Sequence, residues 1–556
     1  MRSMYLFSSE RTTRKSESAK HDWRDSGRIF ESAALKSESA KRDWRDSGRI
    51  FESAALKSEE KRKENPMYYY PTLQQLKEMP DLNRYGVVPV CCELYADRKT
   101  PIEVLRILKH VSSHCYMLES AEDKKQWGRY TFLGYEPTLE ITCHDHKLSI
   151  RSGMTITETV THPGKYLRQI LEQYKSPKLE GMPPFTGGLV GYFSYDYIKY
   201  SEPSLTLDAK EDEHFKDMDL MLFDKVICFD NYRQKIQLIV NCKTDNLETN
   251  YHQAQRQLFD MADLILHGEA AEEKPLHLKS EFRPLFSKDA YCEMVQKGKD
   301  YIKEGDIFQV VLSNRMEADM EGSLLDTYRV LRTSNPSPYM FYFSSEDVEI
   351  AGASPETLVK LEHDKLYTFP LAGTRKRGET EAEDQRLEQE LLADEKERAE
   401  HNMLVDLGRN DIGKISRIAS VEVVKYMEIE RFSHVMHIGS TVTGTIREDK
   451  DAVDAVDAIL PAGTLSGAPK LRACEIINEL EDNKRGIYGG AIGYLDFTGN
   501  LDTCIAIRLA FAKNGKVYVR SGAGIVADSV PEKEYEECIN KAKAVMNALK
   551  EADGGI

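Results

Sequence analysis

The chain lacks the long apolar runs that a membrane-spanning helix needs. No segment of its 556 residues approaches the ~20 consecutive apolar residues that cross a bilayer, and the N-terminal end has no continuous apolar core of a secretory signal. An excess of positive charge is missing too, because the net charge is −16. These absences exclude a helical membrane protein and argue against nucleic-acid or anionic-membrane partners.

Cysteines with a functional spacing are also missing. The ten cysteines are scattered, only Cys91 and Cys92 are adjacent, and no Cys-x-x-Cys pattern occurs. We therefore expect reduced, mostly buried thiols in a cytoplasmic protein, and neither a disulfide framework nor a cysteine-ligated metal.

The N-terminal segment differs in composition from the rest. Residues 15–35 and 36–56 form a tandem repeat of 21 residues, identical except at His21 and Arg42. Residues 1–66 hold 16 Lys+Arg against 12 Asp+Glu, in a chain that is acidic overall. Two copies of a Ser- and charge-rich unit are too few to bury a core. We expect residues 1–66 to be a disordered extension and the functional chain to begin at Met67.

The remaining chain is long enough for more than one structural unit. A polar stretch at residues 268–280 is the best linker, so we predict an N-terminal region at 67–275 and a catalytic region at 276–556. Strand-like runs occur at 115–118, 130–133, 308–314 and 516–520, and helical patterns at 291–304 and 384–406. This mixture predicts an α+β fold with large, mainly antiparallel sheets flanked by helices.

Two glutamate pairs with the same spacing are the most informative feature. Glu397 and Glu400, and likewise Glu534 and Glu537, lie three residues apart and therefore share a helix face. If the helices face each other, carboxylates ~6 Å apart repel by roughly 3 kcal/mol at an effective dielectric of ~20. Mg²⁺, a hard cation that prefers oxygen ligands, removes that cost. From spacing alone, solvated acidic helix faces remain the simpler interpretation.

Other candidate groups have ordinary explanations on their own. The Gly/Thr/Ser segments 372–378, 461–470 and 520–525 let backbone N–H groups approach an anion, but each also suits a common turn. His437 lies in an apolar strand, where a buried structural histidine is common. Glu356 follows a Ser-Pro turn and can be a surface carboxylate.

Five segments of the second half occur together and in order: 354–356, 372–375, 396–401 with 403–411, 461–470, and 522–526. In this combination they resemble the chorismate-utilising enzymes, most closely the anthranilate synthase component I family. The resemblance covers about residues 287–545 and, more weakly through 118–120 and 128–134, about residues 80–230. Nothing in 1–66 takes part.

Two positions bear on the reaction within that family. The residue that matches the water-activating lysine of isochorismate- and salicylate-forming relatives is Gln309, so ammonia, already a nucleophile, is the better reactant. The position of a nucleophilic lysine in many aminodeoxychorismate synthases is Ala372, which cannot form a covalent intermediate. Amination at C2 of chorismate is therefore favoured. Aminodeoxychorismate synthase component I, and a non-catalytic chorismate- or tryptophan-binding subunit, remain alternatives.

The resemblance implies a chorismate-binding-enzyme fold and Mg²⁺-dependent formation of anthranilate and pyruvate from chorismate and ammonia, the first step of tryptophan biosynthesis. It assigns Mg²⁺ to Glu400 and Glu537, with Glu397 and Glu534 in support. Glu356 is the candidate acid for the leaving C4 hydroxyl, and His437 the candidate that assists pyruvate loss. The other implied site residues are Thr464 and Gln309 for catalysis, and Gly373, Thr374, Tyr488, Arg508, Gly522, Gly524 and Lys541 for substrate binding.

The resemblance also implies feedback inhibition and a partner subunit. The implied L-tryptophan site consists of Leu118, Glu119, Ser120, Pro338, Tyr339, Met340 and Cys504. No Gly-x-Cys-x-Gly nucleophile elbow occurs in the sequence. Use of glutamine therefore requires a separate glutamine amidotransferase subunit, component II, and we expect a heterotetramer.

Overall fold

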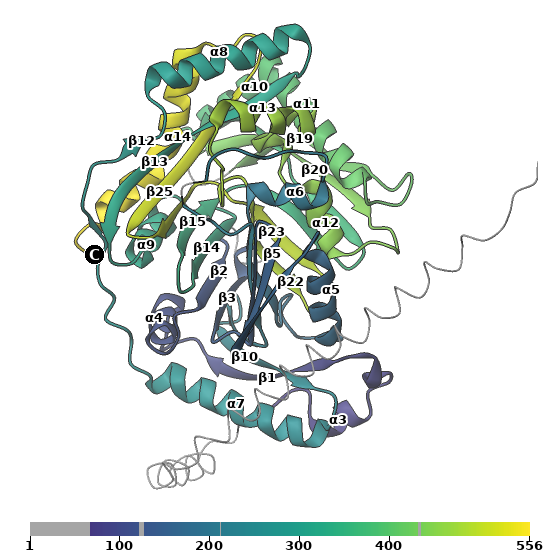
Figure 1. The fold of residues 1–556 in the computed structure, drawn as a ribbon. Helices are drawn as coiled ribbons and strands as arrows, with labels where there is room; N and C mark the ends of the chain where they lie inside the picture. The colour runs from purple at the N-terminus through teal and green to yellow at the C-terminus, as the bar shows by residue number, and fades with distance from the viewer. Residues whose placement is uncertain (1–66, 122–126, 212, 432–434) are drawn as a thin grey trace, which may run out of the picture. The chain divides into compact units, whose positions relative to one another are not determined.

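Two large antiparallel sheets carry the fold (Figure 1). The structure, a computed structural model, describes residues 67–121, 127–211, 213–431 and 435–556. Residues 68–148 and 158–556 form one unit, and residues 149–157, which hold most of β5 (Lys147–Ser152) and part of β6 (Met154–Thr159), fall outside it. The extension predicted for residues 1–66 lies outside the described residues.

The first sheet joins strands from both ends of the chain. Its order is β1-β10-β9-β3-β2-β14-β15-β24-β25-β13-β11, with β12 and β21 also paired to β13. The bounds are β1 Val87–Tyr95, β10 Lys235–Lys243, β9 Lys225–Asp230, β3 Tyr130–Tyr135, β2 Cys115–Glu119, β14 Tyr339–Ser344, β15 Glu349–Ser354, β24 Leu509–Lys513, β25 Lys516–Ile525, β13 Gln309–Glu321, β11 His277–Leu278, β12 Arg283–Pro284 and β21 Gly467–Ala468.

The second sheet is built the same way. Within the unit its order is β18-β20-β17-β16-β23-β22-β7-β8-β4, with β19 paired to β20. The bounds are β18 Leu371–Lys376, β20 Val435–Thr445, β17 Lys365–Thr368, β16 Thr357–Glu362, β23 Leu501–Ile505, β22 Ala491–Asp496, β7 Gly188–Phe193, β8 Met218–Phe223, β4 Leu139–His144 and β19 Glu422–Arg431.

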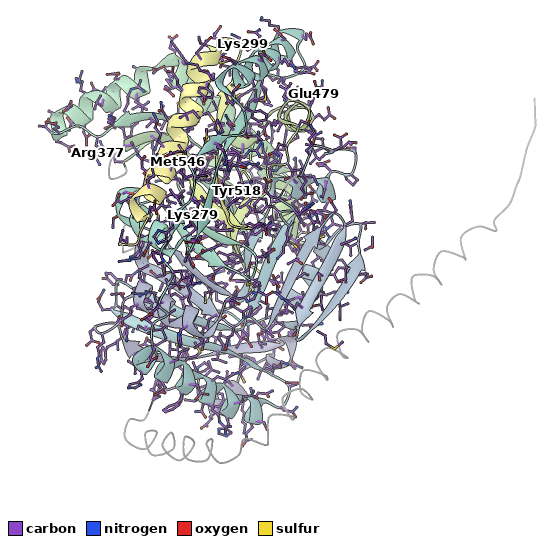
Figure 2. All side chains as sticks on the ribbon, turned by 60° about the vertical axis from the view of Figure 1, so that its left-hand side comes forward. Lys279, Lys299, Arg377, Glu479, Tyr518 and Met546 are labelled. Carbon is purple, nitrogen blue, oxygen red and sulfur yellow. The ribbon has the colours of Figure 1, made fainter. Side chains whose placement is uncertain are left out.

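A core rich in aromatic residues lies between the inner faces of the two sheets. Phe341 and Phe511 come from the first sheet and Tyr192 and Phe223 from the second, and all belong to one buried cluster. Tyr518, labelled inside the molecule in Figure 2, packs against Phe511 and Phe215 at ring-centroid distances of 5.5 and 5.7 Å. Each sheet contains strands from before and after residue 276 in the sequence. The division into regions at 67–275 and 276–556 stays a prediction.

Helices cover the outer faces. Helices α8 and α14 pack on β13 and β25, α7 packs on β10, and α10 and α11 pack on β18 (Figure 1). The bounds are α3 Leu73–Lys77, α4 Pro101–Val111, α5 Gly164–Gln173, α6 Ile198–Ser201, α7 Leu247–His267, α8 Lys288–Glu304, α9 Leu325–Ser334, α10 Glu381–Ala393, α11 Glu395–Gly413, α12 Ala452–Ile459, α13 Lys470–Glu481 and α14 Pro531–Ala552.

Antiparallel sheets flanked by helices confirm the predicted α+β class. The continuous helix predicted over 384–406 is wrong in one respect, because the segment is two helices that meet at Asp394. The Asp394 carboxylate accepts hydrogen bonds from the backbone N–H groups of Lys396 and Glu397, which starts α11 there. No helix in the described ranges is long and apolar enough to cross a bilayer.

Candidate functional site

A cavity of about 540 Å³ lies where β13, β25, α11, α14 and the β15–β16 turn meet. We call it the carboxylate cavity. It brings together most of the residues that the sequence predicts for catalysis, substrate binding and Mg²⁺. Those that line it are Gln309, Glu356, Glu400, Thr464, Tyr488, Arg508, Gly522, Gly524, Glu534, Glu537 and Lys541.

Two helices present the glutamates. Helix α11 carries Glu397 and Glu400 and α14 carries Glu534 and Glu537. Glu400, Glu534 and Glu537 line the cavity, whereas Glu397 does not and lies 3.6 Å from Nη1 of Arg375. Burial, followed by the charge of Glu397, raises the pKa of Glu400, and burial and the charge of Glu537 raise that of Glu534. The charge of Glu537 on α14 also raises the pKa of Glu400 on α11, so carboxylates of the two helices repel each other across the cavity.

The donor set fits Mg²⁺ in part. All of the donors are carboxylate oxygens, which Mg²⁺ prefers, and Mg²⁺ commonly takes only one or two protein carboxylates and keeps waters or substrate oxygens. Two basic side chains compete for these carboxylates: Lys541 Nζ lies 2.7 Å from Glu537 Oε1, and Arg375 Nη1 lies 3.6 Å from Glu397 Oε1. Among the described residues, the only three side chains with ligand atoms all within 4.8 Å of one another are His144, Glu211 and His214, away from this cavity.

Glu356 is the acid in the cavity whose protonation is shifted most clearly. It lies between β15 and β16, and its carboxylate accepts a hydrogen bond of 3.1 Å from the Thr464 hydroxyl. Burial raises its pKa to about 7, although the Thr464 hydrogen bond and the charge of Lys541 act in the opposite direction. A carboxyl group with such a pKa can hold a proton near neutral pH and deliver it.

Gln309 begins β13, and its side chain is almost fully buried at the cavity wall. Its Oε1 is buried and has no hydrogen-bond partner among the described residues. The Gln309 side chain fits here because residue 524 is glycine. A Cβ at residue 524 would lie 2.6 Å from Gln309 Nε2. A buried acceptor left unpaired is costly, so this oxygen is available to a donor from a bound ligand or water.

His437 lies beside the cavity without lining it. On β20, its Nδ1 lies 2.7 Å from the carbonyl oxygen of Gly373 and 3.2 Å from the Thr374 hydroxyl. Because a carbonyl can only accept, Nδ1 carries the proton. Burial lowers the pKa of His437, and Arg508 lowers it further. The imidazole is therefore neutral at pH 7.

The predicted residue Gly373 lies next to Glu397. It has φ +64°, and a Cβ on residue 373 would lie 3.1 Å from Glu397 Oε2.

Four basic residues line the same cavity: Lys396, Arg508, Arg520 and Lys541. Arg508 follows β23 with φ 54°, and its Nη1 donates to the carbonyl of Lys541 at 2.7 Å. Lys541, on α14, donates from Nζ to the carbonyl of Gly522 at 3.1 Å. The cavity therefore holds Arg508 and Lys541 together with the glutamates, a charge pattern that suits a ligand with carboxylate groups and a bridging cation.

A second cavity, of about 410 Å³, lies between β2, β14 and β23, and we call it the aromatic cavity. Its lining contains every residue predicted for the tryptophan site: Leu118, Glu119, Ser120, Pro338, Tyr339, Met340 and Cys504. The volume lies within the range of small-molecule sites. The role of these residues stays a prediction.

The contacts of Glu119 change one detail of that site. Its carboxylate is bound by Arg332, with a 2.9 Å contact from Nη2, and by the Tyr328 hydroxyl at 2.6 Å. Asp502, which is not among the predicted site residues, also lines the cavity, and burial raises its pKa. It lies two residues before Cys504 on β23, so strand periodicity could have identified it.

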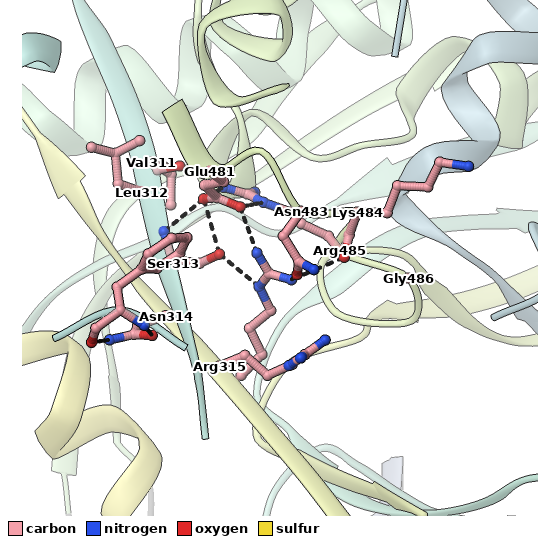
Figure 3. A network of polar contacts seen from close by, with 12 residues as sticks. Val311, Leu312, Ser313, Asn314, Arg315, Glu481, Asn483, Lys484, Arg485 and Gly486 are labelled. Carbon is pink, nitrogen blue, oxygen red and sulfur yellow. Dashed lines mark hydrogen bonds and ion pairs between the residues drawn. The ribbon is translucent and has the colours of Figure 1, made fainter. Parts of the chain in front are cut away.

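A buried ionic network at the wall of the carboxylate cavity was not predicted from the sequence. It consists of Glu481, Arg485, Arg520 and Ser313, and the contacts around Glu481 can be followed in Figure 3. In sequence, Glu481 and Arg485 belong to a charged run at 479–485 that is typical of an exposed turn. Only Arg520 indicates a buried charge from sequence alone, because it lies within the apolar strand β25.

Comparison with known families identifies the fold and its relatives. The family described as chorismate binding enzyme matches residues 113–547. Anthranilate synthase component 1 of Acetivibrio thermocellus is 47% identical over 493 residues, covering 87% of this chain and 99% of the relative. The protein of the same name from Aquifex aeolicus is 43% identical over 489 residues, covering 87% and 98%.

Solved structures agree. The crystal structure of anthranilate synthase component I from Streptococcus pneumoniae matches with a TM-score of 0.65 and 39% identity, covering 75% of this chain and 92% of that one. The menaquinone-specific isochorismate synthase of Escherichia coli matches with a TM-score of 0.62 and 19% identity, covering 86% and 98%, a likeness of fold alone.

Proposed function

The chain belongs to the chorismate-binding enzymes and, among them, to the anthranilate synthase component 1 family, and we propose that it forms anthranilate and pyruvate from chorismate and ammonia. It is an enzyme that acts on chorismate. The observation that carries the detailed proposal is Glu356, a carboxyl group with a pKa near neutrality in a cavity that also holds cations and paired carboxylates.

Glu356 supplies the proton that the first stage needs. Ammonia adds at C2 of the ring while the C4 hydroxyl leaves, and hydroxide is a poor leaving group unless it is protonated. Burial raises the pKa of Glu356 to about 7, so a large fraction of it carries a proton near neutral pH, and the Thr464 hydroxyl fixes the direction of its carboxyl group. General acid catalysis of this kind contributes about 10²- to 10⁴-fold to a rate.

Arg508 and Lys541 bind the carboxylates of chorismate in this proposal. Glu400 and Glu537 would hold Mg²⁺, and Glu397 and Glu534 would support them from the same helices. When bound, Mg²⁺ neutralises the repelling glutamates and attracts the ring carboxylate of the substrate. Tyr488, with Gly522 and Gly524 on β25, forms the wall against which the ring lies.

Gln309 supports ammonia as the nucleophile. Its unpaired Oε1 can accept an N–H from ammonia but cannot remove a proton from water. Ala372, buried on β18, has no nucleophilic group for a covalent intermediate. Both residues favour amination at C2, which yields anthranilate, over hydroxylation or amination at C4.

His437 assists the second stage, in which the intermediate loses its C2 proton and pyruvate. Its Nδ1 proton is engaged by the Gly373 carbonyl, so Nε2 carries the lone pair. Its lowered pKa keeps the ring neutral and able to accept a proton. Thr374, 3.2 Å from Nδ1, restricts the rotation of the imidazole.

Regulation and the nitrogen source complete the proposal. L-Tryptophan occupies the aromatic cavity, where Pro338 and Met340 pack the indole and Asp502 is the carboxylate available to the amino group. Ammonia is supplied from glutamine by a separate amidotransferase subunit, as the name component 1 of the relatives suggests. A heterotetramer with that subunit is the assembly we expect.

One assay tests the proposal. The purified chain is incubated with chorismate, ammonium and Mg²⁺, and anthranilate fluorescence is followed with and without L-tryptophan. Product identification separates o-aminobenzoate from a C4-aminated product. Formation of o-aminobenzoate that stops after EDTA treatment and returns with Mg²⁺ supports the proposal. A C4-aminated product, or no turnover by a folded chain, contradicts it.

A further inference from the structure

Three buried charged side chains meet at the wall of the carboxylate cavity. Glu481 ends α13 and Arg485 lies four residues later in the loop that leads to β22, and both are labelled in Figure 3. Arg520 lies on β25. Their side chains are 0%, 1% and 1% exposed, respectively. Arg520 itself lines the cavity, and so does Tyr488, which follows Arg485 in the same loop.

Hydrogen bonds compensate this buried charge. Glu481 accepts from the Ser313 backbone N–H at 2.8 Å and hydroxyl at 3.0 Å, from Arg520 Nη2 at 2.7 Å and from Arg485 Nε at 3.0 Å. Burial alone would raise the pKa of Glu481, but the two guanidinium groups hold it below its ordinary value. Apolar residues of similar volume often stabilise a fold as well as such a group does. Stability alone therefore does not explain this ionic group. The N–H groups of Arg485 that do not bind Glu481 indicate another role.

Arg485 uses those donors on two backbone carbonyls at the cavity. Nη1 donates to the carbonyl of Leu465 at 2.6 Å, and Nη2 donates to the carbonyl of Val311 at 2.7 Å. Leu465 and Val311 both line the carboxylate cavity. The guanidinium plane is restrained by the Tyr195 ring, whose centroid lies 4.6 Å away. One planar group thus joins two segments more than a hundred residues apart in the chain.

The Leu465 carbonyl belongs to the turn that carries Thr464. Residues Gly463–Leu465 form one short 3-10 turn, and the Thr464 hydroxyl donates to Glu356. We propose that Arg485, held by Glu481, is a positioning residue that fixes this turn so that the Thr464 hydroxyl meets Glu356. The inference rests on the proposed role of Glu356 as the acid of the first stage.

The geometry requires arginine at position 485. Its five N–H groups lie in one plane, and here they serve a carboxylate and two carbonyls at once. Lysine keeps the charge that neutralises Glu481 but is a single point donor on a flexible stem. Arg485→Lys therefore removes the link to the turn more selectively than a change to an apolar residue does.

The experiment compares Arg485→Lys, Thr464→Val and the double variant in the chorismate and ammonium assay. Arg485→Lys is expected to lower kcat about 10- to 100-fold, the cost of a misplaced catalytic contact, while KM for chorismate changes less than about threefold. If Arg485 acts through Thr464, the double variant is no slower than the slower single variant. Arg129→Lys, which weakens an ion pair with buried Asp230 away from the carboxylate cavity, is the control and should keep kcat.

The pH profile separates positioning from general loosening. Thr464 and Lys541 are the groups that lower the pKa of Glu356, and Lys541 is unchanged in these variants. Loss of the Thr464 contact raises that pKa, so the fall of kcat at alkaline pH moves to higher pH in Thr464→Val. Arg485→Lys should show the same shift. Two results together overturn the inference: the fold losses of kcat in the single variants multiply in the double variant, and the dependence of kcat on pH is the same in Arg485→Lys as in the wild type.

A variant without the three charges guards against misfolding. Should Arg485→Lys fail to fold, the triple change Glu481→Leu, Arg485→Met and Arg520→Met replaces the whole ionic group by apolar side chains. It should fold, and its kcat should fall with the same shift of the pH profile; wild-type kcat overturns the inference. If the wild-type chain makes no anthranilate, the proposed function fails instead, which is a separate result.

Discussion

The hydroxyl oxygen of Tyr339 lies 3.0 Å from Oγ1 of Thr357, so a residue of the aromatic cavity contacts the neighbour of Glu356. Tyr339 lines the aromatic cavity, and Thr357 directly follows Glu356. The Tyr339 hydroxyl also donates to Asp502 at 2.8 Å, and Thr357 pairs with Cys504 across β16 and β23. A ligand that moves Tyr339 or Asp502 therefore acts on the residue next to the candidate acid.

Tyr339→Phe should uncouple inhibition from tryptophan binding. The aromatic ring at position 339 and the residues proposed to pack the indole, Pro338 and Met340, all remain, so the Kd of L-tryptophan should change little. The hydroxyl that contacts Thr357 is lost, so the effect of tryptophan on chorismate binding should weaken by about 1 kcal/mol, or fivefold. Calorimetry and inhibition kinetics measure the two quantities separately.

Ser120→Phe is the matched comparison. It fills the aromatic cavity and should abolish both tryptophan binding and inhibition, while the rate without tryptophan stays near that of the wild type. A Tyr339→Phe protein that is inhibited as strongly as the wild type would show that the Thr357 contact does not transmit the signal. Unchanged inhibition of Ser120→Phe would remove Ser120 from the site.

The four glutamates should differ in their effect on Mg²⁺. Glu400→Gln or Glu537→Gln removes a proposed ligand and should raise the Mg²⁺ concentration for half-maximal activity at least about 100-fold, whereas Glu397→Gln or Glu534→Gln should raise it about 10- to 100-fold. EDTA-treated protein titrated with Mg²⁺ gives these values, and thermal melting with Mg²⁺ reports binding independently of activity.

Glu536→Gln is the control for that series. Its side chain lies next to Glu537 on α14 but is 65% exposed and does not line the cavity. It should behave as the wild type. Equal activity of all variants with and without Mg²⁺ would return the glutamates to the simpler interpretation of solvated helix faces.

Activity should fall as pH rises through about 7. Burial raises the pKa of Glu356 to about 7, and an acid is useful only in its protonated form, so kcat should fall on the alkaline side of that value. The measurement is kcat against pH at constant free ammonia. Glu356→Gln cannot deliver a proton and should be at least about 100-fold slower with a flat profile. A wild-type profile without this alkaline fall contradicts the assignment.

His437→Ala should slow the second stage more than the first. The C2-aminated intermediate should accumulate, and pyruvate release should slow about 100-fold, because the group that assists proton loss is gone. Chromatography of quenched reactions resolves the intermediate from anthranilate. His252→Ala, an exposed change on α7, is the control. Anthranilate formed at the wild-type rate, with no accumulated intermediate, would show that His437 has no such role.

The parts of the site that follow from local periodicity were predictable from sequence. Glu397 with Glu400, and Glu534 with Glu537, share helix faces at a spacing of three, and the structure confirms both helices. A local pattern of the same kind caps α3, where the Thr72 hydroxyl accepts from the Gln75 N–H. Local patterns of this kind need no knowledge of tertiary contacts.

The remainder depends on pairings that join distant segments. Whether Glu119 is available to a ligand depends on Arg332, 213 residues later. The environment of Arg485 depends on carbonyls from β13 and from the turn at Gly463–Leu465. The break at Asp394 was missed because 384–406 is helical in pattern on both sides, and a side-chain cap decides where one helix ends and the next begins.

The order of strands in the two sheets has a consequence for how the chain reaches its native state. Strand β2 pairs with β14, and β7 pairs with β22, so neighbouring strands are separated by more than two hundred residues. Such high contact order makes folding slow, because long loops must close before these pairs form. A fragment that begins at residue 276 would leave β14 and β22 with open edges, which invite aggregation. Polypeptides split near that residue should therefore recover both cavities only by complementation, when the two fragments fold together.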